Sequence, residues 1–268
     1  MPDLSLRIVY KTENMERVGA PRSVVYKSQD GIDLRMDIYT PPDVKADARL
    51  PVVLFVHGGP VPREMAAPTT WGIFQSYGAL LAAAGLIAVT FNHRLHGLSD
   101  YERSQSDIAD ALGFVRAHAG ELRADPERIG LWYFSGAGPQ LSWLLREMPG
   151  YVRCAAAFYA MLDVRNLLPP GADEKALAAA TALSPVTYLR SSGPKLPLFV
   201  ARAGQDSPMV NIGLDAFVHA ALATNAELDF MNHPAGAHSF ECLTDDQRTR
   251  DILASAITFM RRHLTGGA

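Results

Sequence analysis

The fold is decided by the stretch Arg128-Ile-Gly-Leu-Trp-Tyr-Phe-Ser135-Gly-Ala-Gly-Pro-Gln140. Residues 129–134 are apolar almost without interruption, which is typical of a strand buried on both faces of a parallel sheet. The small residues 135–138 follow, where the chain can turn sharply. Pro139 suits the first turn of a helix, because the N–H that it lacks would have no partner there. The stretch therefore predicts a strand, a tight turn at Ser135 and a helix.

Outward from this stretch, predicted strands and helices alternate along most of the chain. Short apolar runs typical of buried strands lie at residues 51–56, 86–91, 152–159, 196–203 and 228–231. Stretches with helical periodicity lie between or after them, at residues 71–84, 104–118, 140–147, 211–223 and 245–263. This alternation predicts an α/β fold with a mostly parallel central sheet and helices on both faces.

Two other regions complete the expected architecture. Residues 22–28 and 32–39 alternate apolar and polar side chains around an Asp-Gly pair, which predicts antiparallel strands at the sheet edge. Residues 162–190 are irregular apart from a helical piece at 174–182, and we expect them to form a small cap over the carboxyl edge of the sheet. Repeats and polar linkers are lacking, so residues 1–268 are expected to form a single domain.

The composition is that of an ordinary globular protein, with 48% hydrophobic and 20% charged residues and a net charge of −3. This charge balance predicts neither a nucleic-acid partner nor a membrane partner. The sequence lacks a signal-peptide pattern, and Cys154 and Cys242 are expected to be free thiols, which together predict a cytoplasmic protein. Zinc-site spacings and glycine-rich phosphate loops are lacking, so no metal is expected. A homodimer is compatible with the sequence.

Side chains suited to nucleophilic catalysis follow several of the predicted strands. Ser135 ends the strand quoted above, Asp206 follows the strand at 196–203, and His238 follows the last strand. Because the carboxyl ends of parallel strands share one edge of the sheet, we expect these side chains to meet. Serine is a poor nucleophile unless a base such as imidazole removes its proton during attack. A carboxylate can then hold the imidazole in the required tautomer.

Other residues compete for these roles. Ser135 could instead be a turn or helix-capping serine, since serine is common in both places. His233 is the chief alternative to His238 as the base, although it lies earlier after the strand. Asp163 follows the preceding predicted strand and is the alternative to Asp206 as the acid.

Further polar residues near these strand ends are expected to be structural. His57 is expected to be structural rather than to react. Arg94 is expected to form an ion pair with Asp107. Glu241 is expected to be a surface or capping group.

The frame 133–137, Tyr-Phe-Ser-Gly-Ala, resembles the nucleophile elbow of the α/β-hydrolase family, written G-x-S-x-G, with tyrosine and alanine replacing its glycines. The chain order of serine, aspartate and histidine is also that of the family, whereas other serine hydrolases use other orders. Residues 125–130 look like the lead-in to the elbow in hormone-sensitive-lipase, acetyl-xylan-esterase and kynurenine-formamidase-like esterases. Residues 236–240 resemble their histidine loop G-x-H-x-F, which dienelactone hydrolases share.

The resemblance implies an α/β-hydrolase fold and an oxyanion hole made of backbone N–H groups. The residue after the nucleophile, Gly136, would supply one donor. Gly58 and Gly59 follow His57 and match the HGG oxyanion loop of the lipase and esterase branch. Glycine at these positions lets the backbone approach the substrate, because no Cβ stands in the way.

The expected function is therefore a serine esterase that cleaves a small carboxylic ester through an acyl-enzyme intermediate. Pro60, Trp71 and Tyr133 are expected to contact this substrate. No cofactor is expected, because the triad and the backbone donors suffice for acyl transfer. An amidase, an acyltransferase or a lyase would need the same residues. A non-catalytic binding protein is the other alternative, since Tyr133 and Ala137 depart from the consensus.

Overall fold

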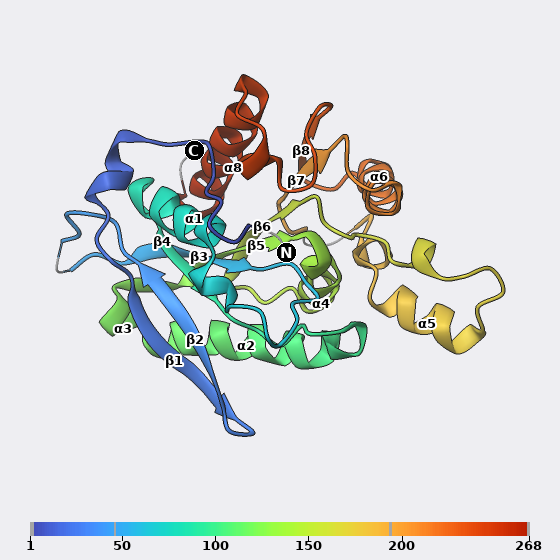
Figure 1. Cartoon of the computed structure of the whole chain (residues 1–268), viewed down its shortest axis with the longest axis horizontal. Coiled ribbons are helices and arrows are strands. Elements are labelled where there is room, and N and C mark those ends of the chain that lie inside the picture. The colour runs from blue at the N-terminus through green and yellow to red at the C-terminus, as the bar shows by residue number, and fades with distance from the viewer. Residues whose placement is uncertain (1–2, 46, 193–194, 267–268) are drawn as a thin grey trace.

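A computed structural model describes residues 3–45, 47–192 and 195–266 of the chain. In these residues an eight-stranded sheet has the order β1-β2-β4-β3-β5-β6-β7-β8 (Figure 1). The strands are β1 (Arg22–Gln29), β2 (Ile32–Tyr39), β3 (Leu50–Val56), β4 (Ile87–Phe91), β5 (Ala124–Phe134), β6 (Val152–Phe158), β7 (Leu198–Ala203) and β8 (Leu228–His233). β1 and β2 are antiparallel to their neighbours, and the other strands run parallel, which confirms the predicted fold class.

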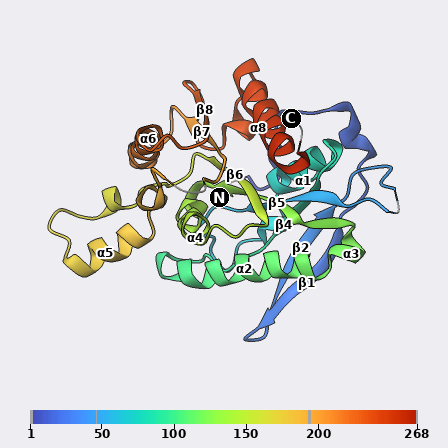
Figure 2. The same cartoon turned by 180° about the vertical axis from the view of Figure 1, so that it is seen from behind.

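Helices cover both faces of this sheet. The α-helices of the described residues are α1 (Gly72–Ala83), α2 (Tyr101–Ala117), α3 (Ala119–Leu122), α4 (Leu141–Glu147), α5 (Glu174–Ala182), α6 (Pro208–Ala223), α7 (Phe240–Leu243) and α8 (Gln247–Thr265). Short 3₁₀ helices span Glu13–Arg17, Pro68–Thr70, Leu98–Asp100, Ser135–Gln140, Arg165–Leu167 and Pro185–Tyr188. Figures 1 and 2 show α1 and α8 on one face and α2 on the other.

The central strands are buried on both faces, as their uninterrupted apolar character predicts. In β3, Val52 and Leu54 join the core cluster under α2, α4 and α6. Val53 and Phe55 alternate with them and join the cluster under α1 and α8. Because successive side chains of a strand point to opposite faces, one apolar run supplies both cores.

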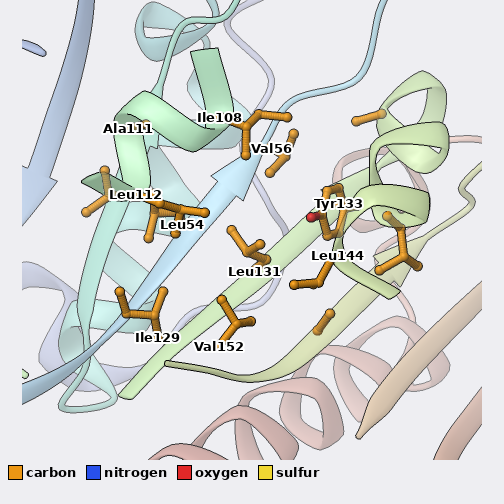
Figure 3. Packing of buried hydrophobic residues seen from close by; sticks show 14 of the residues in the cluster. Leu54, Val56, Ile108, Ala111, Leu112, Ile129, Leu131, Tyr133, Leu144 and Val152 are labelled. Carbon is orange, nitrogen blue, oxygen red and sulfur yellow. The ribbon is translucent and has the colours of Figure 1, made fainter. Parts of the chain in front are cut away.

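Tyr133 belongs to the core, so the prediction that it contacts substrate is wrong. Its side chain is 0% exposed and lies among Val56, Leu131 and Leu144 (Figure 3). The residue paired with it on β6 is Ala157, whose small side chain leaves room for the ring. The inward direction follows from strand alternation, which places Tyr133 on the same face as Leu131.

The expected cap, residues 162–190, lies at one end of the molecule. Its helical piece is α5, with the predicted bounds Glu174–Ala182. In Figures 1 and 2, α5 projects beyond α4 and α6 at the edge of the fold. Only Ala180 is buried within α5, so this helix shares little of the core.

The predicted ion pair is present at the end of β4. Arg94 donates from Nε and Nη2 to the two carboxylate oxygens of Asp107, at 2.9 and 2.7 Å. Lys27 donates to the same carboxylate at 2.7 Å. Burial alone would raise the pKa of Asp107, but these hydrogen bonds hold that pKa below its usual value. Arg94 is therefore structural, and it holds the loop after β4 against α2.

Candidate active site

The turn at Ser135 is a strained elbow at the carboxyl end of β5. Ser135 has φ of +51°, a left-handed conformation that side chains other than glycine adopt rarely. Its carbonyl accepts a hydrogen bond from the Met161 N–H at 3.1 Å. The chain then continues as a 3₁₀ turn, Ser135–Gln140, before α4 begins at Leu141, so the predicted helix starts later than expected.

Two glycines of the elbow are required by close contacts. A Cβ at Gly136 would lie 2.0 Å from the Gly59 carbonyl oxygen, and one at Gly138 would lie 2.3 Å from the Met161 carbonyl oxygen. Ala137 sits between them and packs into the core under α4. The consensus glycine at position 137 is thus dispensable here, because the close approach occurs at Gly138 instead.

The glycines after β3 meet the elbow, as the sequence predicts. A Cβ at Gly58 would lie 2.9 Å from the Ser135 Cβ and 3.4 Å from its Oγ. Gly59 lies against Gly136, and the Val61 N–H donates to the Leu95 carbonyl at 2.8 Å. The glycines predicted to supply the oxyanion donors therefore lie beside Ser135.

His57 supports this glycine loop through a buried chain of hydrogen bonds. The His93 N–H donates to His57 Nε2 at 3.2 Å, so His57 carries its proton on Nδ1 and donates it to the Gly58 carbonyl at 2.7 Å. The two imidazole rings stack with centroids 3.6 Å apart. Burial lowers the pKa of His57 to about 4, which keeps the ring neutral and its Nε2 free to accept. His57 is therefore structural, as expected.

His93 continues the same chain. Its Nε2 donates to the His57 carbonyl at 3.1 Å, so its Nδ1 accepts from Ser104 Oγ at 2.7 Å. Ser104 Oγ accepts in turn from Gln140 Nε2 at 2.9 Å. The glycine loop is thereby tied to α2 and to the end of the elbow.

His238 and Asp206 form a hydrogen-bonded pair after β8 and β7. His238 Nδ1 and Asp206 Oδ2 are 2.6 Å apart, and the Asp206 side chain is only 4% exposed. The other carboxylate oxygen of Asp206 accepts from the Ser207 N–H at 2.7 Å. His238 and Ser135 line the same cavity. This arrangement suits a base whose tautomer is set by a carboxylate.

The competing residues are engaged elsewhere. His233 is 1% exposed, and its Nε2 pairs with Thr249 Oγ1 at 3.0 Å. Its ring packs on Gly236, where a Cβ would lie 2.7 Å away. Asp163 accepts hydrogen bonds from Arg165 at 2.6 and 2.9 Å. The geometry therefore favours His238 over His233 and Asp206 over Asp163.

The cavity beside Ser135 has a volume of about 530 Å³. Pro60 and Trp71 line it, as predicted for substrate contacts, whereas Tyr133 does not. Its remaining apolar walls include Leu4, Leu6, Val61, Met65, Ile73, Phe74 and Leu243. Residues 162–190 contribute nothing to the lining within the described chain, so they do not cover this site in the way expected of a cap.

Segment 3–10 supplies part of the wall instead, and sequence reasoning missed it. The Gly72 N–H donates to the Leu4 carbonyl at 2.8 Å, and the Ile8 N–H donates to Ser76 Oγ at 3.1 Å. A Cβ at Gly72 would lie 2.4 Å from the Ser5 carbonyl oxygen, so segment and helix are in tight contact. The alternation of apolar residues at 4, 6 and 8 was the available signal.

Glu241 is buried, so its expected place at the surface is wrong. Its side chain is 0% exposed, and Oε1 accepts hydrogen bonds from the hydroxyls of Tyr77, at 3.2 Å, and Tyr159. Tyr159 lines the cavity and its ring lies 4.5 Å from that of His238, centroid to centroid. Neither tyrosine was a candidate, because aromatic residues in apolar runs ordinarily predict core.

The described residues contain neither a metal-binding cluster nor a membrane-spanning helix. They hold no cluster of three or more His, Cys, Asp or Glu side chains arranged to bind a metal ion. None of their helices combines the length and the apolar character needed to cross a membrane. Cys154 and Cys242 are free, as expected.

The sheet order, the strained serine after β5 and the histidine–aspartate pair after β8 and β7 are those of the α/β-hydrolase fold. The BD-FAE family matches residues 36–149 of the chain. Esterase 2 of Thermogutta terrifontis, solved with butyrate bound, superposes with a TM-score of 0.75 at 21% identity, covering 93% of this chain and 97% of that one.

Curated relatives of the chain are named as esterases or hydrolases. Esterase LipQ of Mycobacterium tuberculosis is 24% identical over 273 residues, which cover 91% of this chain and 63% of LipQ. Pyrethroid hydrolase Ces2e of Rattus norvegicus is 28% identical over 141 residues, which cover 48% of this chain and 23% of that protein. The chain thus spans 63% of the length of LipQ and 23% of the length of Ces2e.

Proposed function

We propose that this protein is a serine esterase, in which Ser135 is the nucleophile, His238 the base and Asp206 the acid. One observation carries the proposal: His238, held by Asp206 at 2.6 Å, lines the same cavity as Ser135 at its strained elbow. The names of LipQ and of the Thermogutta esterase support ester hydrolysis as the reaction.

In the proposed reaction, Ser135 Oγ attacks the ester carbonyl while His238 Nε2 takes its proton. Asp206 stabilises the imidazolium, and the backbone N–H groups of Gly136 and of the loop with Gly58 and Gly59 stabilise the oxyanion. Collapse of the tetrahedral intermediate breaks the ester C–O bond, and the imidazolium protonates the departing alcohol. Water, activated by the same imidazole, then hydrolyses the acyl-enzyme.

The cavity supports an uncharged, apolar substrate of small to medium size. Its volume is about 530 Å³, and most of the side chains that line it are aliphatic or aromatic. Asp3 contributes a carboxylate to the lining. An anionic acyl group would be disfavoured beside this carboxylate. The Thermogutta esterase has been solved with butyrate and with propionate bound, which supports short-chain acyl groups as first substrates to test.

The test is hydrolysis of p-nitrophenyl esters, from acetate to octanoate, by the wild type and by Ser135→Ala. We expect the variant to lose at least about a thousandfold in kcat, because nucleophile and base act as a unit. Labelling by a fluorophosphonate should be stoichiometric in the wild type and absent in Ser135→Ala. The Thermogutta esterase, solved phosphorylated by paraoxon, is a suitable positive control. Equal ester turnover by both proteins would contradict the assignment of Ser135.

A further inference from the structure

Glu241 carries a buried carboxyl group that the proposed mechanism does not use. Oε1 accepts from the hydroxyls of Tyr77 and Tyr159. Oε2 is buried without a hydrogen-bond partner among the residues that the structure describes. Burying a carboxyl group is costly, and the two tyrosine hydroxyls offset part of that cost here.

The tyrosines are the donors in this cluster. Burial raises the pKa of Tyr77 and of Tyr159 well above the usual value, so both hydroxyls keep their protons. Burial also raises the pKa of Glu241, against the opposing effect of these hydrogen bonds. The other titratable groups that face the carboxyl are Cys242, on the same helix α7, and His238, just before that helix. Glu241 thus serves as a fixed acceptor for two aromatic hydroxyls.

Tyr159 connects this carboxyl to the active site. Its φ of +38° is unusual for a bulky residue, and its N–H donates to the Ala201 carbonyl at 2.8 Å. The hydroxyl end is held in the core by Glu241. The ring lines the cavity and packs on the imidazole of His238, at 4.5 Å between centroids and an interplanar angle of 54°.

His238 needs such support. Its side chain is 40% exposed, and the residues before it, Gly236 and Ala237, offer little bulk to pack against it. The hydrogen bond to Asp206 fixes the position of one ring nitrogen only. Misplacing a catalytic group by about 1 Å can cost about a hundredfold in rate.

We propose that Glu241 is a positioning residue for His238: it anchors the Tyr159 hydroxyl, and the Tyr159 ring keeps the imidazole aligned with Ser135. The inference rests on the proposed function, in which His238 is the base. It assigns no direct contact between Glu241 and the substrate.

Two matched variants test this inference, Tyr159→Phe and Tyr77→Phe. Each removes one hydroxyl from the same carboxyl oxygen, but only Tyr159 contacts His238. We expect Tyr159→Phe to lower kcat about tenfold. Loss of the hydroxyl should displace the ring, and with it His238, by less than about 1 Å, and a displacement of about 1 Å costs about a hundredfold in rate. KM should stay within about twofold, since the aromatic ring still lines the cavity. Tyr77→Phe should keep kcat within about twofold of wild type, even if it lowers the melting temperature as much as Tyr159→Phe does.

Substitutions of Glu241 provide the rescue test. Glu241→Leu keeps similar bulk without an acceptor, and it should lower kcat as much as Tyr159→Phe does. Glu241→Gln retains an amide oxygen that can accept the hydroxyl, so it should keep most of the wild-type kcat. Combining Glu241→Leu with Tyr159→Phe should cost no more than either change alone, because both break one contact.

A spectroscopic measurement separates this inference from the esterase proposal. The low-field proton resonance of the His238–Asp206 hydrogen bond, assigned by its loss in His238→Gln, should broaden in Tyr159→Phe and stay unchanged in Tyr77→Phe. Failure of the wild type to hydrolyse any ester would contradict the proposed function, while this resonance would still report on His238. An unchanged resonance in Tyr159→Phe, or equal kinetic losses in both tyrosine variants, would overturn the positioning role.

Discussion

Segment 3–10 and the insertion 162–190 both lie outside the sheet, yet only the first reaches the active site. Segment 3–10 places Leu4 and Leu6 in the cavity wall. The insertion was expected to act as the cap, but its helix α5 projects at the edge of the fold (Figure 1). Position between two strands is therefore a poor guide to which segment covers a site.

The difference lies in how each segment is attached. Segment 3–10 donates from the Ile8 N–H to Ser76 and from the Val9 N–H to the Glu241 carbonyl, and the Ile8 side chain is 2% exposed in the core. By contrast, Leu177 on α5 is 50% exposed. Few buried apolar contacts characterise the parts of a protein that open most easily. The flanks of the insertion are packed, since Leu162 is buried and Val186 and Tyr188 lie against the core, so α5 is the part of it expected to open most easily.

The largest effect on the role of segment 3–10 is expected from Gly72→Ala. Its Cβ would lie 2.4 Å from Ser5 O and 2.6 Å from Leu6 O, so segment 3–10 must move away. If two methylene groups of the substrate lose their contact with this wall, binding should weaken by about 1.5 kcal/mol, which is a factor of about ten in kcat/KM. We therefore expect kcat/KM for the octanoate ester to fall about tenfold, with little change for acetate.

The matched control for that substitution is Gly113→Ala on α2, where a Cβ would meet nothing within 4 Å. It should leave the kinetics unchanged and stabilise the helix by up to about 1 kcal/mol, because alanine favours helix over glycine. If Gly72→Ala behaves like this control across the ester series, segment 3–10 does not form the substrate wall.

A smaller effect is expected from Leu6→Ala, which removes part of the wall without moving the backbone. The loss of about 1 kcal/mol of apolar contact should raise KM for the octanoate ester about fivefold, with kcat preserved. Leu177→Ala on α5 is the comparison, since this leucine is exposed and lies outside the cavity lining. Equal changes in KM from the two variants would remove the distinction between the segments.

The smallest kinetic effect is expected from Asp173→Ala. Asp173 caps α5, since its side chain accepts from the Ala176 N–H at 2.7 Å. Removing the cap should destabilise α5 locally by about 1 kcal/mol. Amide hydrogen exchange in residues 174–182 should accelerate, while kcat and KM stay within about twofold. A larger kinetic change would mean that the insertion does act on the site.

Much of the site could be predicted from local patterns. The apolar run before Ser135 and the small residues after it predict the strand and the elbow, and both are present. Asp206 and His238 were expected to meet because parallel strands end at one edge, and their side chains are 2.6 Å apart. The expected Arg94–Asp107 ion pair is also present.

The errors concern residues whose environment depends on distant parts of the chain. Tyr133 stands beside the nucleophile in sequence, but strand alternation directs it into the core, where Ala157 of the next strand makes room. Glu241 has the chemistry of a surface residue, but Tyr77, 164 residues away, and Tyr159, 82 residues away, hold it in the interior.

The sequence by itself determined the alternation of strands and helices, the elbow at Ser135 and the edge at which Asp206 and His238 meet. These follow from short-range periodicity, turn chemistry and the common direction of parallel strands. Only the tertiary structure decided what surrounds that site: segment 3–10 in its wall and Glu241 behind its histidine. Those contacts join residues far apart in the chain, such as Ile8 and Ser76 at a separation of 68, and no local pattern specifies them.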